Sequence, residues 1–145
     1  MGFLDFWRQE QETQPSEHQL TLSGDSERLP DKRGRTDGGK IFKRFTDSIK
    51  ANGGDCYNDA VQEETAELFG CGVRELYKAT GGKRRDRSTL PEMVQQAYMA
   101  NEVLTAVELE RWIGSLPHQE QEAVNEAILN IVSDESKKTR NRLPW

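Results

Sequence analysis

Apolar residues recur at helical spacing through the middle of the chain. Five stretches share this pattern: Gly39–Ala51, Tyr57–Phe69, Val73–Thr80, Pro91–Gly114 and 115–133. A glycine follows each of the first three within two residues, as is typical of helix ends. No run of alternating apolar and polar residues indicates a strand. The pattern therefore predicts a single, small all-α domain of about five helices.

Both ends of the chain lack this pattern. Residues 1–38 are rich in Gln, Glu, Ser, Asp and Gly, and most of this stretch has too few large apolar groups to offset the entropy of ordering it. Residues 134–145 are polar and basic. We therefore expect a disordered tether at 1–38, a helical domain at 39–133 and a flexible basic tail at 134–145.

An aromatic cluster stands at the start of this tether, ahead of the polar residues 8–38. Phe3, Phe6 and Trp7 would share one side of a helical turn. One interpretation is a short peptide that docks on a protein partner or touches a membrane surface. The others are a strap that packs back onto its own domain, or simple disorder.

Composition narrows the class of protein. The chain contains no run of about eighteen apolar residues, so we expect no transmembrane helix. Its first residues do not have the pattern of a secretory signal. The two cysteines, Cys56 and Cys71, make no disulfide framework, and with only His18 and His118 beside them a zinc site lacks ligands at short spacing. We expect a cytoplasmic protein without a metal or other cofactor.

The charge is unevenly distributed along the chain. The formal net charge is −5. Residues 38–87 nevertheless hold ten Lys and Arg against eight Asp and Glu, whereas residues 88–133 hold one against seven. A protein that is acidic overall can therefore present a basic contact surface in its middle segment.

The segment Gln62–Gly81 has the spacing of a helix-turn-helix. Ala66 supplies the small residue where two helices cross closely, and Gly70 can take the positive φ that the turn needs. Leu76 can pack back under the first helix, with Ala79 one turn later. Phe69 and Cys71 flank the glycine with apolar side chains.

This spacing resembles the helix-turn-helix of lambdoid Cro-type repressors, over about twenty residues. The resemblance implies binding to double-stranded DNA. It implies that Arg74 and Tyr77 reach base edges and that Lys78 contacts phosphate.

A basic loop follows the predicted helix pair. Lys83, Arg84, Arg85 and Arg87 could clamp the phosphate backbone and add affinity without reading sequence. The alternative is a charged loop that is merely solvated.

A looser resemblance covers roughly residues 57–110. The order Leu68-Phe69-Gly70, Glu75-Leu76, Gly81 and Arg85-Asp86, followed by an apolar helix containing Glu102, is similar to a helical segment of phage Bro-type and damage-inducible D proteins. That resemblance implies a regulatory or nucleic-acid-associated accessory role.

The later helices carry more apolar residues than one narrow stripe needs, among them Tyr98, Met99, Val103, Leu104 and Trp112. They either wrap the helix pair into one core or form a homodimer face. A dimer face would present two recognition helices one DNA turn apart.

No residues stand at a spacing that favours catalysis, because no Ser or Cys has a histidine at usable distance and no complete phosphate loop is present. We therefore expect a non-enzymatic, DNA-binding regulatory or phage- or plasmid-type accessory protein. The competing hypothesis is a protein-interaction adaptor that docks through its N-terminal aromatic peptide.

Overall fold

A computed structural model describes residues 2–13, 28–116 and 120–145, with the side chains of 13 and 28–36 left out of the description. Every regular element in these ranges is helical, which confirms the all-α expectation. The elements are α1 (Phe3–Thr13), α3 (Arg28–Ala51), α4 (Tyr57–Phe69), α5 (Val73–Thr80), a short 3-10 helix η2 (Arg87–Thr89), α6 (Glu92–Arg111) and α7 (Gln121–Arg140).

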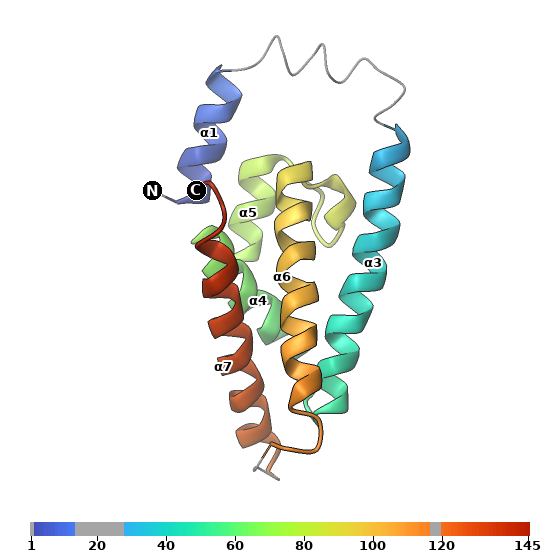
Figure 1. Ribbon diagram of the computed structural model, residues 1–145. Coiled ribbons are helices and arrows are strands. Elements are labelled where there is room, and N and C mark those ends of the chain that lie inside the picture. The colour runs from blue at the N-terminus through green and yellow to red at the C-terminus, as the bar shows by residue number, and fades with distance from the viewer. Residues whose placement is uncertain (1, 14–27, 117–119) are drawn as a thin grey trace.

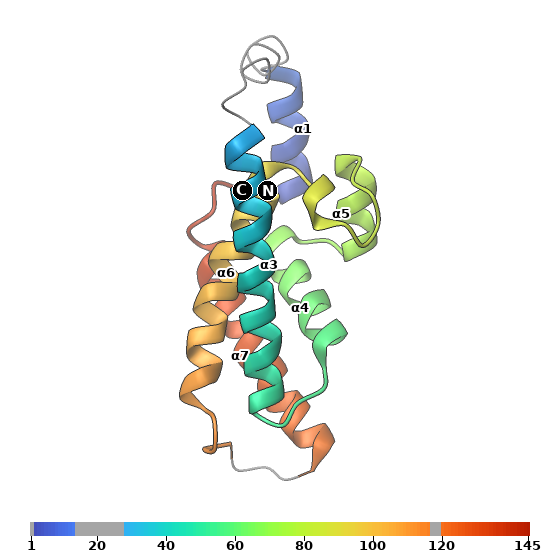
Figure 2. The same cartoon turned by 90° about the vertical axis from the view of Figure 1, so that its right-hand side faces the viewer.

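Four of these helices form a bundle. Helix α3 packs along α6, α6 along α7, and α4 along α7 (Figure 1). Helices α1 and α5 lie toward one end of the bundle, and the two ends of the chain come close together there (Figures 1 and 2). Within the described ranges no helix combines the length and the apolar character that crossing a membrane requires.

Two apolar clusters fill the core. The aliphatic cluster lies between α3, α4, α6 and α7, and its fully buried members are Phe45, Ile49, Ala60, Leu109, Ile128 and Val132. The aromatic cluster lies where α1 and α5 meet the bundle, and its largest members are Phe3, Phe69, Tyr77, Tyr98 and Trp145.

A layer of buried polar side chains lies between these clusters. Along α4, Ala60 belongs to the aliphatic cluster and Leu68 to the aromatic cluster, and the fully buried Glu64 stands between them. This layer also interrupts α6, where Asn101 and Glu102 stand between Tyr98 of the aromatic cluster and Leu109 of the aliphatic cluster. We call this the polar layer, and its members are Glu64, Arg87, Asn101, Glu102, Ser136 and Thr139.

The predicted bounds of two helices are confirmed: α4 spans Tyr57–Phe69 and α5 spans Val73–Thr80. Gly70 ends α4 with φ +69°, and its N–H donates to Ala66 O at 2.9 Å. Leu76 is fully buried, as the helix-turn-helix spacing predicted.

The close helix crossing expected at Ala66 is wrong. Both Ala66 and Ala79 are exposed. Helix α4 instead buries the face that carries Ala60, Glu64 and Leu68, because that face packs against the bundle. Ala66 therefore points to solvent, and the two small residues do not set the spacing of α4 and α5.

The predictions for the chain ends also need correction. Within the expected tether, α1 is a helix and α3 begins at Arg28, while residues 14–27, including His18, lie outside the described residues. The expected flexible tail is ordered: α7 continues to Arg140 and Trp145 is buried. The predicted start of the last helix includes Pro117 and His118, which also lie outside the described residues.

Candidate functional site

A groove of about 950 Å³ opens between α4, α5 and the loop that follows α5. We call it the basic groove. Helix α4 forms one wall and α5 the other, and the loop closes one side beside Phe42 of α3. Its lining residues are Phe42, Asn58, Val61, Gln62, Val73, Arg74, Tyr77, Lys78, Gly82, Arg84, Arg85 and Arg87.

Four exposed cations converge on this groove. Arg74 and Lys78 stand one turn apart on α5 and so share a face, and Arg84 and Arg85 come from the loop. None of the four forms an ion pair with any residue in the described ranges. Among the residues that the structure describes, no acidic side chain lines the groove. The structure thus brings six of the seven residues predicted to contact DNA to one groove, and four of them are exposed cations without an ion-pair partner in the described ranges.

The loop is held in place by its own hydrogen bonds. The N–H of Lys83 donates to Thr89 Oγ1 at 2.7 Å, and that hydroxyl donates to Asp86 O at 2.6 Å. Arg85 has φ +68°, a left-handed conformation that costs a side-chain-bearing residue roughly 1–2 kcal/mol. The Arg84 and Arg85 side chains therefore extend from a fixed backbone.

Gly82, at the start of this loop, lies where neighbouring side chains leave little room for a Cβ. A Cβ on it would lie 3.1 Å from both Leu90 Cδ2 and Tyr77 Cδ1. The loop backbone is thereby pressed against α5 and the aromatic cluster. Lys83, also predicted as a phosphate contact, is exposed but does not line the groove.

Arg87 corrects the prediction of a free phosphate clamp. Its guanidinium lies between two rings, with Cζ 4.0 Å from the Tyr98 ring centroid and 4.5 Å from that of Phe42. Nη1 is 2.8 Å from Glu102 Oε2, and Nη2 is 3.8 Å from Glu64 Oε2. Because the buried carboxylate of Glu102 needs a cation beside it, Arg87 is drawn inward and its charge is already balanced.

Tyr77 corrects the prediction of a base-reading side chain. It is 7% exposed and belongs to the aromatic cluster, because its position on α5 faces the bundle beside Leu76. Only part of its surface is left at the groove floor. Tyr77 therefore has no freedom to reach the edge of a base pair.

Glu64 and Glu102 are the buried charges that sequence reasoning missed. Their carboxyl groups lie close enough to affect each other's pKa, and two neighbouring buried carboxyl groups favour a proton on one of them. Burial, followed by the neighbouring Glu102 carboxylate, holds the pKa of Glu64 well above its usual value. Burial also raises the pKa of Glu102, although Arg87 opposes that shift. A protonated Glu64 beside an ionised Glu102 and Arg87 leaves the polar layer electrically neutral.

Neutral side chains complete the polar layer. Asn101 Nδ2 donates to Glu64 Oε1 at 3.1 Å and to Ser136 Oγ at 3.0 Å. The hydroxyl of Thr139 donates to Asn101 Oδ1 at 2.9 Å. Both ends of the Asn101 amide are thus hydrogen-bonded, and they tie α6 to α4 and α7.

The N-terminal aromatic peptide is not free for an external partner. Phe3 is fully buried, with its ring centroid 4.7 Å from that of Trp145 and 5.1 Å from that of Phe69. Phe6 lies 5.5 Å from Trp145, and Trp7 stacks 6.2 Å from Phe3. The expected partner-binding residues therefore form a strap on their own domain, which was one of the alternatives.

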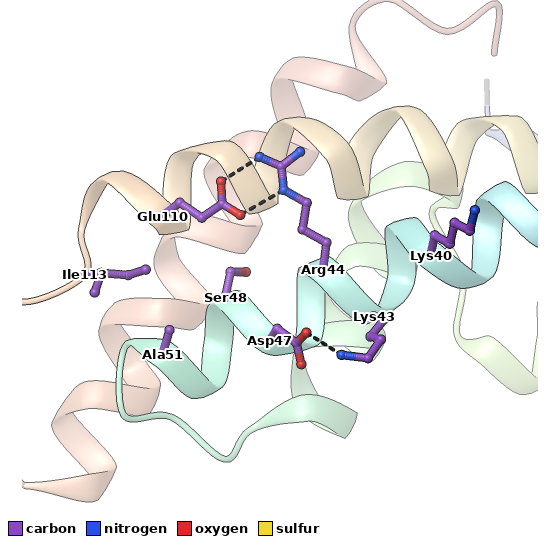
Figure 3. A pocket seen from close by; sticks show the side chains of 8 residues that line it. All are labelled: Lys40, Lys43, Arg44, Asp47, Ser48, Ala51, Glu110 and Ile113. Carbon is purple, nitrogen blue, oxygen red and sulfur yellow. Dashed lines mark hydrogen bonds and ion pairs between the residues drawn. The ribbon is translucent and has the colours of Figure 1, made fainter.

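A second hollow, of about 400 Å³, lies between α3 and the end of α6 (Figure 3). It also has basic residues, but two of them are paired. Arg44 forms two hydrogen bonds with Glu110, at 2.6 and 2.8 Å, and Lys43 contacts Asp47 at 2.8 Å. Lys40 lies apart from both pairs (Figure 3). Since its acids cancel most of the positive charge, this hollow is a poorer anion site than the basic groove.

No group of three or more His, Cys, Asp or Glu side chains in the described ranges is placed to hold a metal ion. Comparisons with models of protein families, with curated proteins and with solved structures gave no match.

Proposed function

We propose that this protein is a small regulatory or accessory protein that binds nucleic acid by holding phosphates in the basic groove. The observation that carries the proposal is the convergence of Arg74, Lys78, Arg84 and Arg85 on one groove, with no acidic partner in the described part of the chain. Four unpaired cations in one concavity repel each other, and a polyanion relieves that repulsion.

Such binding depends mainly on charge. Each cation that neutralises a phosphate releases counterions, so the affinity falls steeply as salt is added. Because Tyr77 is buried, only one of the two predicted base-reading side chains, Arg74, remains exposed at the groove. We therefore expect affinity without marked sequence preference, because phosphate contacts carry no sequence information.

The test is a titration of labelled DNA of random sequence, followed by fluorescence anisotropy at several salt concentrations. Replacing both Arg84 and Arg85 with alanine should weaken binding to every sequence alike. It should also reduce the slope of log K against log salt by about two, because two phosphates are no longer neutralised.

The matched control removes two positive charges elsewhere. Lys50→Ala with Arg142→Ala changes exposed residues outside the groove and alters the net charge equally. The control should bind as the parent does. Equally weakened binding by both double variants would mean that overall charge, and not the groove, determines binding, and the proposal would fail.

A further inference from the structure

The free cations of the groove lie on the walls of a concavity, and this limits what shape of nucleic acid can meet them. Arg74 and Lys78 belong to α5, while Arg84 and Arg85 belong to the loop beside it. Arg85 is fixed in a left-handed conformation, and the loop backbone is hydrogen-bonded at Lys83 and Thr89. The cations are therefore presented together, around one space of about 950 Å³.

A duplex does not fit this arrangement well. Duplex readers insert a protruding helix into a major groove about 12 Å wide. Helix α5 has eight residues, and its Leu76 and Tyr77 side is buried in the aromatic cluster. A rigid duplex could touch the rim of the groove but could not enter it.

A single strand fits better. Strand-binding grooves combine basic side chains for the backbone with surfaces that accept unpaired bases. The α4 wall supplies the exposed amides of Asn58 and Gln62, which can bond to base edges. The half-buried Val61 and Val73 supply apolar surface between the two walls.

We propose that the basic groove takes a single strand of nucleic acid, with phosphates on Arg74, Lys78, Arg84 and Arg85 and unpaired bases toward Val61 and Gln62. This inference rests on the proposed function and names the ligand class of the same site. Arginine side chains also stack on bases, so Arg84 and Arg85 can contact both parts of a nucleotide.

The experiment measures how tightly the full chain binds two labelled probes at low salt. One probe is a single strand of twelve thymidine nucleotides, and the other is a twelve-base-pair duplex of random sequence. We expect the single strand to bind at least tenfold more tightly. Duplex binding that equals or exceeds it would overturn the inference and leave the proposed function standing. No binding of either probe would overturn both.

A pair of variants tests whether the strand lies inside the groove. Gln62→Glu adds one negative charge to the α4 wall without changing side-chain shape. Asn130→Asp makes the same kind of change on an exposed part of α7, outside the groove. Gln62→Glu should weaken single-strand binding several-fold, and Asn130→Asp should not. Indistinguishable affinities for these two variants would place the strand elsewhere and overturn the inference.

Discussion

Arg87 belongs to two environments. The residue lines the basic groove, and its guanidinium contacts Glu102 and Glu64 inside the bundle. Removing one partner of a buried ion pair leaves the other charge in a poorly polar surrounding, which costs far more than the pair contributes. We therefore expect Arg87 to contribute to the stability of the fold, whereas its neighbours Arg84 and Arg85 contribute to binding.

We expect Arg87→Met to lower the free energy of unfolding by about 3–5 kcal/mol, because Glu102 loses its cation. Arg84→Met should change it by less than about 0.5 kcal/mol, since Arg84 is exposed and forms no ion pair with a described residue. Urea unfolding of both variants measures the difference. Similar midpoints for the two variants would contradict the buried role of Arg87.

The raised pKa of Glu64 makes stability depend on pH. Its folded pKa lies above the unfolded value of about 4.3, so the folded protein binds the proton more tightly. This contribution is fully present below the unfolded pKa and is lost as pH rises through the folded pKa. Urea midpoints should therefore fall as pH rises above the unfolded pKa of about 4.3.

Glu64→Gln is the control for this effect, because glutamine keeps the shape of a protonated glutamate and does not ionise. Its stability should be close to that of the parent at low pH and should decline less toward alkaline pH. Parallel pH profiles for parent and variant would show that Glu64 does not hold the proton.

Among the elements, α1 depends on one residue far away in the chain. Trp145 contacts Phe3, Phe6 and Phe69, and its indole N–H donates to Leu68 O at 2.7 Å. An isolated helix of eleven residues is marginal in water. The helical state of α1 is therefore maintained by the aromatic cluster.

Trp145→Ala should destabilise the protein by about 3–5 kcal/mol and should also reduce helical content, since α1 loses its support. Trp112→Ala is the matched control, because that side chain is 39% exposed. Thermal unfolding followed by circular dichroism gives both quantities. A midpoint for Trp145→Ala no lower than that of the control would refute the dependence of α1 on Trp145.

Sequence reasoning located the elements whose apolar stripe and terminal glycine agree. For α4 and α5 both signals were present, and their bounds were correct. It missed α1, because Phe3 is buried by Phe69 and Trp145, which lie far from it in the chain. It also ended α7 too early, because Ser136 and Thr139 look like surface residues and are in fact buried in the polar layer.

The candidate site could be predicted in the same uneven way. Sequence reasoning found four of the groove residues, Arg74, Lys78, Arg84 and Arg85. It could do so because these basic side chains are exposed, as basic side chains usually are. Arg87 was grouped with them, since a run of basic residues does not show which one turns inward. No sequence signal marks Glu64 and Glu102 as buried, because a glutamate in a helix looks the same in sequence whether it is buried or exposed.

For the whole molecule, the charge distribution favours the approach of a polyanion toward the basic groove. Residues 88–133, which include α6 and much of α7, hold seven acidic residues and one basic residue. A polyanion is repelled from those helices and attracted at the basic groove. The acidic net charge is therefore compatible with a localised anion site.

The contact between Phe3 and Trp145 has a consequence for synthesis. The chain is made from its N-terminus, so the docking site of α1 on Phe69 and Trp145 stays incomplete until Trp145 has been added and has left the ribosome. Until then Phe3, Phe6 and Phe69 expose aromatic surface of the kind that molecular chaperones bind. Pulse-labelling by hydrogen exchange during refolding should accordingly find the amides of α1 protected later than those of α4 and α6, because the longest chain closure comes last.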